Sequence, residues 1–168
     1  MPKVTRVDAS RNGNMVMGGY EYEESSGVVV MEAERFATSV QEPGTQWTVI
    51  PDLGRTLSGL SLMPYTKPVS GASLTYQMRL KSDLSGVRVR LILDSTLPFI
   101  KGGHSYAIRL DDGEEQIVNY NSGLTWANCY SKMYPAGAAR VIESKVTFPG
   151  CHSGGRVHTL TIRLSVRR

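Results

Sequence analysis

The sequence predicts an all-β protein, an antiparallel and jelly-roll-like β-sandwich of two sheets. Apolar residues recur at every second position in several short segments, which is the pattern of half-buried strands. Gly, Pro, Ser or Asp residues bound each of these segments, and no long stretch has helical periodicity. Many short strands separated by turns indicate a sandwich or a barrel, and glycine-rich loops of unequal length favour the sandwich.

Five segments carry this alternation, and each predicts a strand with one face toward a core. The alternating sets are Leu74, Tyr76, Met78 and Leu80; Val87, Val89, Leu91 and Leu93; Tyr106, Ile108 and Leu110; Ile142, Ser144, Val146 and Phe148; and Leu160, Ile162, Leu164 and Val166. Arg88 and Arg90 alternate with the second set, so we expect them on a solvated sheet face.

The connections between these strands have their own signals. The residues "DDGEEQ" at 111–116 predict a hairpin in which Gly113 has a positive φ and the acidic side chains solvate the tip. A short turn at 126–133, stopped by Pro135, is the best helical candidate, and we expect less than about a tenth of the chain to be helical. Trp47 precedes an apolar run and is expected inside the core.

Length and charge exclude several classes of protein. At 168 residues the chain is long enough for one domain with a substantial core. Its formal charge of +4 comes from scattered residues, without the basic tract and stacking aromatics of a nucleic-acid-binding protein. Membrane spans and the apolar core of a signal peptide are also missing from the pattern. We expect neither nucleic acid nor membrane as a partner, and either a cytosolic protein or an excised part of a secreted one.

No catalytic constellation emerges from the reactive side chains. We expect the three histidines, His104, His152 and His158, to be structural or solvated, since no nucleophile accompanies them. The hairpin acids are too crowded to flank a sugar from opposite sides. Cys129 and Cys151 form no metal pattern and are either free thiols or a disulfide that stabilises by roughly 3 kcal/mol. The chain is therefore predicted not to be an enzyme.

Two features point instead to binding. The stretch "VVVMEAERF" at 28–36 predicts a strand with Glu32 and Glu34 on one face at its end, where their repulsion requires a partner. The loop "TWANCYSKMYPAG" combines aromatic rings with amide and hydroxyl groups, as sugar-binding loops do; its proposed contacts are Trp126, Tyr130, Tyr134 and Asn128. The alternative is that Trp126 and one tyrosine close the end of the core.

Several motifs in order resemble a known family. "VVVMEAERF", "WTVIPDLGRTLSGLSLMP", "VRLILDSTLPF", "HSYAIRLDDGEEQIVNYN", Trp126 and "VHTLTIRL" are similar to the C-terminal β-sandwich domain of family 115 α-glucuronidases. That domain resembles in turn the carbohydrate-binding modules of families 6 and 35. The resemblance spans residues 28–164. It implies a parent catalytic domain that removes glucuronic acid from xylan, in an extracellular or periplasmic system.

The resemblance also suggests a role for the acidic pair. In related modules the "EAE" segment contributes a carboxylate to a structural calcium, which implies that Glu32 and Glu34 hold calcium here. Arg55 is a rival partner that would neutralise one carboxylate without a metal. The family pattern continues with a further strand where this chain ends in "SVRR", so residues 15–21 are expected to fill that edge. Residues 1–27 are predicted to be a linker or edge-strand extension of the module at 28–168.

Three functions follow from these observations. The first is a non-catalytic carbohydrate-binding module for plant cell-wall polysaccharide, xylan or glucuronoxylan, in which Arg55 and Asn128 contact the uronate-bearing chain. The second is a structural accessory or dimerisation domain of a family 115 α-glucuronidase without a sugar site, which an exposed apolar patch would favour. The third is an independent enzyme, which the absence of a catalytic constellation disfavours.

Overall fold

The computed structural model describes residues 21–53, 56–94, 103–125, 127–128, 139–152 and 155–165. These residues form ten strands and no helix, which confirms the prediction of an all-β fold. The strands are β1 (Glu21–Glu23), β2 (Thr38–Val40), β3 (Gln46–Ile50), β4 (Gly59–Met63), β5 (Ser73–Arg79), β6 (Leu84–Asp94), β7 (Ser105–Leu110), β8 (Gln116–Asn119), β9 (Ala139–His152) and β10 (Val157–Ser165).

The larger sheet has the order β1-β5-β10-β7-β8, and β2 pairs with β5 outside this path. Strand β5 pairs with β10 along its whole length on one edge. Its other edge is shared, because β2 pairs antiparallel with residues 73–75 and β1 pairs parallel with residues 77–79. Strands β1 and β2 have only three residues each, so neither leaves a long unpaired edge.

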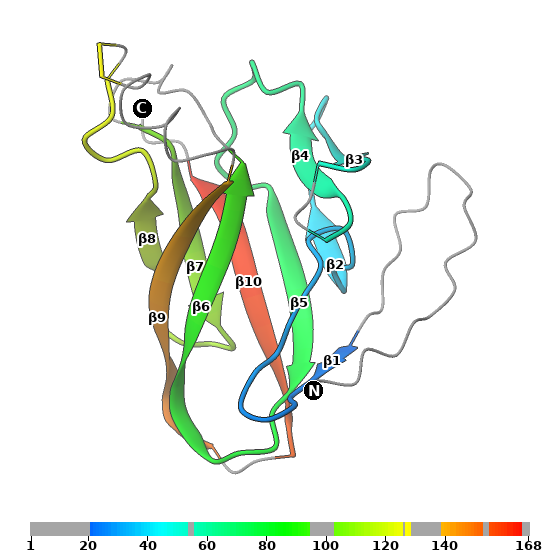
Figure 1. Ribbon diagram of the computed structural model, residues 1–168, viewed down its shortest axis with the longest axis vertical. Coiled ribbons are helices and arrows are strands. Elements are labelled where there is room, and N and C mark those ends of the chain that lie inside the picture. Colours follow the sequence, from blue (N-terminus) through cyan, green and yellow to red (C-terminus); the bar gives the residue numbers. More distant parts are fainter. Residues whose placement is uncertain are drawn as a thin grey trace.

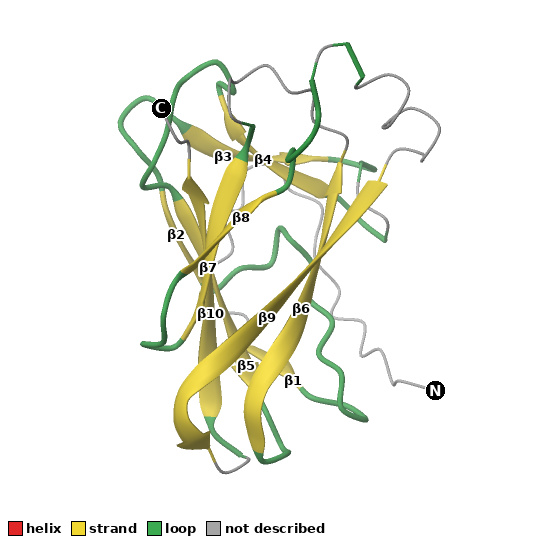
Figure 2. Ribbon diagram, turned by 90° about the vertical axis from the view of Figure 1, so that its left-hand side faces the viewer, coloured by secondary structure: helices red, strands yellow, loops and turns green. Residues whose placement is uncertain are grey.

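Two strand pairs cover this sheet. The long antiparallel pair β6–β9 lies in front of β10 in Figure 1, and Figure 2 shows it as a separate layer. The pair β3–β4 lies at the upper end of the molecule. This arrangement of two layers agrees with the predicted sandwich.

The core fills the space between the layers. Its buried residues come from both layers and their connections: Phe36, Trp47, Leu62, Val69, Ala72, Leu74, Tyr76, Met78, Leu80, Tyr106, Ile108, Leu110, Val146 and Leu160. Strand β6 contributes one apolar face, since Val87, Val89 and Leu91 pack against this cluster while its alternate residues are exposed. Trp47 is buried as predicted, and its indole N–H donates to the backbone oxygen of Val40 at 3.0 Å.

A hydrogen bond joins the two layers inside the core. The hydroxyl of Tyr106 on β7 lies 3.0 Å from that of Ser144 on β9, and both residues are buried. Burial raises the pKa of the Tyr106 phenol, so the neutral hydroxyl is the form that the core retains. Because two buried polar groups satisfy one another only at one alignment, this contact helps to fix the position of β9 over β7.

All five segments with alternating residues form strands, but the strand predicted over residues 28–36 is wrong. Val28 makes a single bridge to Ser25, and a turn occupies residues 33–34. The N–H of Arg35 donates to the backbone oxygen of Glu32 at 3.1 Å, within the chain and not to a neighbouring strand. Apolar alternation at 28–31 puts Val29 and Met31 against the core without requiring a strand partner.

The predicted hairpin at 111–116 is present between β7 and β8, but its details differ from the prediction. Asp111 has the positive φ, 49°, instead of Gly113. The carboxylate of Asp111 does not solvate the tip, because it accepts the N–H of Thr159 at 2.7 Å and contacts Nδ1 of His158 at 2.8 Å. His158 is therefore a buried residue that joins β10 to the hairpin, and Asp111 adopts an unfavourable φ that these bonds offset.

The segment around β1 is anchored to the sandwich although it lies in the predicted extension 1–27. Glu24, in the loop after β1, is buried and accepts three hydrogen bonds, from the N–H groups of Lys81 and Ser82 and from the Ser82 hydroxyl. The Ser82 hydroxyl, followed by the two N–H groups, lowers the pKa of Glu24. Strand β1 is thus an edge strand beside β5; the boundary at residue 27 stays a prediction.

Strand pairing in the covering layer depends on a glycine. The β6–β9 register shifts between Leu84 and Gly86, where β9 has extra residues. A Cβ atom on Gly86 would lie 2.7 Å from the backbone oxygen of Val146 and 3.1 Å from Cα of Thr147. Backbone atoms cannot move aside as a flexible side chain can, so a larger residue at this position would force β6 and β9 to shift.

We therefore expect Gly86→Ala to lower the free energy of unfolding by about 1–3 kcal/mol, the usual cost of overpacking. Urea denaturation measures the change, and Ser85→Ala, at the exposed neighbouring position, is the control with little effect. Equal stability of the Gly86→Ala variant and the wild type would contradict the close approach of β6 and β9.

Candidate functional site

The predicted aromatic loop lies in the sequence between β8 and β9. Strand β6 ends and strand β7 begins at the upper end in Figure 1, and the described residues 120–125 continue from the end of β8. Trp126, Tyr130, Tyr134 and Arg55 lie outside the described residues, so their roles stay predictions. Of the helical turn predicted at 126–133, only residues 127 and 128 are described, and they lie in a turn. Asn128 is described, and it shows how this loop is held.

Asn128 closes the described part of the loop. Its Oδ1 accepts the N–H of Thr125 at 2.8 Å, and its Nδ2 donates to the backbone oxygen of Gly123 at 3.1 Å. The N–H of Asn128 also donates to the backbone oxygen of Thr125 at 3.2 Å. The amide therefore joins the residues on both sides of position 126, as asparagine side chains do in turns.

A hydrogen bond between two further asparagines holds the start of the loop. Oδ1 of Asn119, the last residue of β8, accepts the N–H of Asn121 at 3.0 Å. Asn121 is only 1% exposed, and its backbone oxygen accepts the N–H of Leu124 at 3.0 Å. Successive local hydrogen bonds thus order the chain from β8 to Asn128.

A stack of three rings supports the start of this loop. The ring of Tyr120 stacks on buried His104 at 5.8 Å and on buried Tyr106 at 6.1 Å, measured between centroids. The N–H of Tyr120 donates to the backbone oxygen of His104 at 3.0 Å. Next to it, Gly103 has φ 84°, and a Cβ there would lie 2.8 Å from Oδ1 of Asn119. His104 is thus a packed structural residue, in agreement with the sequence prediction.

These supports were missed at the sequence level, although a signal for them exists. The stretch "NYNSG" at 119–123 is rich in turn residues and directly precedes the aromatic loop. An ordered loop loses little conformational entropy when it binds a ligand. The described part of this end is therefore suited to presenting side chains in a fixed arrangement.

The acidic pair lies in the irregular segment 28–36, away from that loop. Both carboxylate oxygens of Glu32 lie within hydrogen-bonding distance of the Thr56 hydroxyl, at 2.7 and 2.8 Å. Glu34 differs, because its Oε2 is buried and has no hydrogen-bond partner. Burial raises the pKa of Glu34, and the nearby charge of Glu32 raises it further.

Two tyrosines hold this acidic segment in place. The Tyr22 hydroxyl on β1 donates to the backbone oxygens of Arg35 at 2.9 Å and Glu32 at 3.3 Å. The Tyr76 hydroxyl on β5 donates to the backbone oxygen of Ala33 at 2.8 Å. Burial raises the pKa of Tyr22 to about 12 and that of Tyr76 further. Both phenols are therefore permanent donors at neutral pH, and they fix the backbone that carries Glu32 and Glu34.

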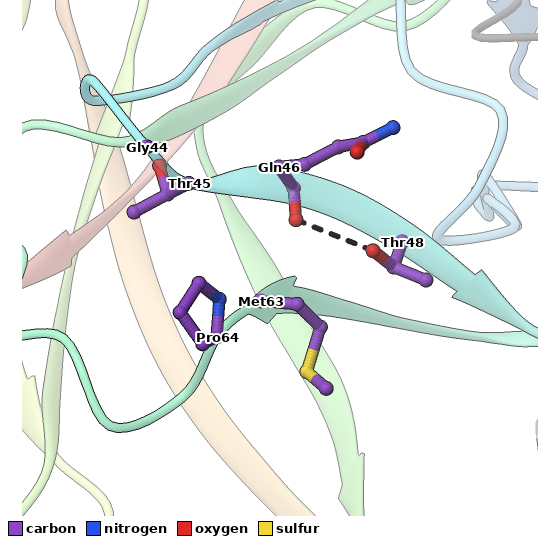
Figure 3. A pocket seen from close by; sticks show the side chains of 6 residues that line it. All are labelled: Gly44, Thr45, Gln46, Thr48, Met63 and Pro64. Atoms are coloured by element: carbon purple, nitrogen blue, oxygen red, sulfur yellow. Dashed lines mark hydrogen bonds between the residues drawn. The ribbon is translucent and has the colours of Figure 1, made fainter.

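The described residues offer few other sites. They contain no cluster of three or more His, Cys, Asp or Glu side chains that could hold a metal. They also include no helix long and apolar enough to cross a membrane. A depression on the outer face of β3–β4 is lined by Gly44, Thr45, Gln46, Thr48, Met63 and Pro64 (Figure 3). Its lining has neutral polar and apolar groups without an ionisable side chain.

Comparison with known families decides the family of this domain. Residues 21–166 match the C-terminal domain of glycosyl hydrolase family 115. The chain belongs to this family. The GH115 C-terminal domain is thus the whole of the described sandwich, and the match begins at β1, the edge strand that Glu24 anchors.

Among solved structures, the GH115 C-terminal domain is similar to part of BtGH115A, a family GH115 4-O-methyl-α-glucuronidase with specificity for decorated arabinogalactans. The two are 17% identical with a TM-score of 0.45, and the match covers 77% of this chain and 16% of that one. The chain therefore spans about a sixth of that enzyme's length. No curated protein gives a significant match.

The buried oxygen of Glu34 leads to a test by pH. A carboxyl group whose pKa is higher in the folded state than in the unfolded state stabilises the fold only while it is protonated, so its contribution is lost as pH rises through the folded pKa. In the presence of a chelator that removes calcium, we expect Glu34→Gln to raise the melting temperature at pH 7. The gain should shrink as pH falls toward the unfolded glutamate value of about 4.3.

Thermal unfolding between pH 4 and pH 8 measures this difference. Glu32→Gln is the matched control, because its carboxylate has a hydroxyl partner. A Glu34→Gln variant that is less stable than the wild type at pH 7 in chelator would show that the ionised carboxylate has a stabilising partner.

Proposed function

We propose that this GH115 C-terminal domain is a non-catalytic carbohydrate-binding module for plant cell-wall polysaccharide, xylan or glucuronoxylan. The observation that supports this most directly is the set of asparagine hydrogen bonds that orders the described residues 119–125 and 128 of the predicted loop. In the proposal the parent catalytic domain cuts the polysaccharide, outside the cell or in the periplasm, and this domain keeps the enzyme on its substrate.

Aromatic and polar groups have separate roles in such a site. The C–H groups of a sugar face pack on an indole or phenol ring, which the proposal assigns to Trp126, Tyr130 and Tyr134. Hydrogen bonds and charge then select the sugar, and Arg55 supplies a guanidinium for a uronate. The amide of Asn128 is already committed to Thr125 and Gly123, so we assign it the role of shaping the loop.

Retention on gels that contain xylan tests this site. Trp126→Ala, or Tyr130→Ala with Tyr134→Ala, should remove about 1–3 kcal/mol of stacking and burial and so abolish the retention of a weak module. Arg55→Ala should weaken binding only to uronate-bearing chains, whereas Asn128→Ala should weaken binding to all xylans. Tyr65→Ala is the matched control, since Tyr65 is 67% exposed on a different connection.

The melting temperature of each variant separates binding from folding. A Trp126→Ala variant that folds normally and binds xylan as before would exclude this loop as the site. A Trp126→Ala variant that fails to fold would place the indole in the core; the Tyr130 and Tyr134 variants then decide the question.

We also propose that Glu32 and Glu34 hold a structural calcium ion. The buried Oε2 of Glu34 without a partner is the observation that fits, because a hard cation prefers carboxylate oxygens. Bound calcium would neutralise the two charges and connect the segment 28–36 to its neighbours. The competing hypothesis, a salt bridge to Arg55, requires no metal.

Calcium titration distinguishes these two arrangements. If Glu34 is a ligand, adding calcium after chelation should raise the melting temperature of the wild type, because a ligand that binds only the folded state stabilises it. The same addition should leave Glu34→Gln unchanged. A wild type that does not respond to calcium, with Arg55→Ala less stable, would support the salt bridge instead.

An exposed apolar patch favours the second candidate function, a docking domain of the parent enzyme. Four apolar residues of β3 and the connection to β4, which we call the apolar patch, are 36–45% exposed: Val49, Ile50, Leu53 and Leu57. Several exposed apolar side chains in neighbouring segments are a feature of interaction surfaces. If the domain binds no polysaccharide but associates with the parent catalytic region, and Leu53→Ser with Leu57→Ser prevents this association, the docking function is the correct one.

A further inference from the structure

The outer face of the β6–β9 pair carries a cluster of charges. Arg88 and Arg90 lie two residues apart on β6. On β9, Lys145 is the cross-strand partner of Arg88, and Glu143 is the partner of Arg90. All four residues are exposed. Three cations around one carboxylate leave a formal charge of +2 on this surface, which we call the cationic face.

Glu143 orients both guanidinium groups. Its Oε1 lies 3.2 Å from Nε of Arg88, and its Oε2 lies 3.0 Å from Nε of Arg90. Each arginine therefore uses its Nε for this contact, and among the described residues no other group bonds the N–H donors of their Nη atoms, which stay available for a second partner. The side chains of the two arginines are 56% and 64% exposed.

Beyond the cationic face, the same ladder continues with an apolar pair. Ile92 and Val141 are direct cross-strand partners, and they are 49% and 53% exposed. Residues 88, 90 and 92 share one face of β6, so the arginines and the apolar pair form a track along the strand. Adjacent positions on this track are about 7 Å apart, twice the rise per residue of a strand.

This combination selects a particular kind of partner. Guanidinium groups with free Nη donors form bidentate hydrogen bonds with carboxylates. The apolar pair is far too small for a stable protein interface, which buries about 800 Å² on each partner. A linear track of donors followed by a small apolar surface instead matches a linear chain that carries carboxylates at intervals.

We propose that the cationic face binds the uronate groups of an acidic polysaccharide, with Ile92 and Val141 in contact with a neighbouring sugar ring. This inference builds on the proposed polysaccharide-binding function, and it adds a second contact surface formed by strands instead of loops. Here the charge supplies selectivity for acidic chains, whereas the aromatic loop would bind charged and neutral xylans.

A pair of matched polymers tests the proposal. Native glucuronoxylan and the same polymer after reduction of its carboxyl groups differ only in charge. We expect the wild-type domain to bind the native polymer at least about tenfold more tightly in affinity electrophoresis, as expected for hydrogen bonds between charged groups. In Arg88→Gln with Arg90→Gln this difference should shrink to the part that Arg55 contributes, and binding to the reduced polymer should be unchanged. Added salt should reduce the wild-type difference.

Two further variants separate a site from a general effect of charge. Lys67→Gln with Lys81→Gln removes the same charge from exposed positions on another part of the surface and should retain the preference. Arg88→Lys with Arg90→Lys keeps the charge but loses the fork of donors, so part of the preference should be lost. Arg88, Arg90 and Lys81 lie in exposed ion pairs and Lys67 is exposed, so these substitutions should barely change the melting temperature.

The outcomes are distinct from those for the aromatic loop. If Trp126→Ala loses binding to the reduced polymer, the result supports the aromatic loop as a binding site and does not test the cationic face. The cationic face is excluded as a uronate site if Arg88→Gln with Arg90→Gln keeps the full wild-type preference for native polymer, or if the Lys67 and Lys81 control loses it equally. The proposal is also overturned if these arginines are required only for association with the parent catalytic region, since the partner is then a protein.

Discussion

The rest of the structure depends on covering the apolar face that β5, β10 and β7 present. Their inward side chains, among them Tyr76, Ile108 and Leu160, are almost completely buried, and burial of such surface is the main favourable contribution to folding. The β6–β9 pair supplies the matching layer with its own alternating face. The 44 residues that separate β6 from β9 in the sequence include β7 and β8 of the larger sheet, and the ordered loop follows β8.

Hydrophobic burial alone does not fix how the strands and loops are aligned with one another, and polar contacts define this alignment. The bond between Tyr106 and Ser144 joins the layers, and Glu24 joins the β1 segment to the start of β6. The hydroxyls of Tyr22 and Tyr76 hold the backbone of the acidic segment. In each case a buried polar group has a partner distant in sequence, as the low-dielectric interior requires. Oε2 of Glu34 is an exception to this rule among the described side chains, because it is buried without a hydrogen-bond partner. For that reason we propose it as a calcium ligand.

The surfaces of this GH115 C-terminal domain divide its possible contacts among different elements. The asparagine-ordered loop, the cationic face and the apolar patch lie on the β8–β9 connection, the β6–β9 pair and the β3–β4 hairpin, respectively. Under the proposed function, one of these surfaces contacts the parent enzyme and another contacts the polymer. Rigid strands under each surface keep these contacts independent, because substitutions at distant exposed positions have nearly additive effects.

The sequence by itself determined five of the ten described strands, the all-β class, the burial of Trp47 and the solvated face of Arg88 and Arg90. These properties depend on period-two alternation, which is local and decides which side chains face the core. The tertiary structure alone decided that residues 28–36 form no strand and that Asp111, not Gly113, has the positive φ. It also decided that His158 pairs with Asp111 and that Asn128 shapes its own loop. A backbone needs a paired neighbour to be a strand, and the carboxylate of Asp111 finds its partners 47 and 48 residues away; such contacts leave no periodic signal in the chain.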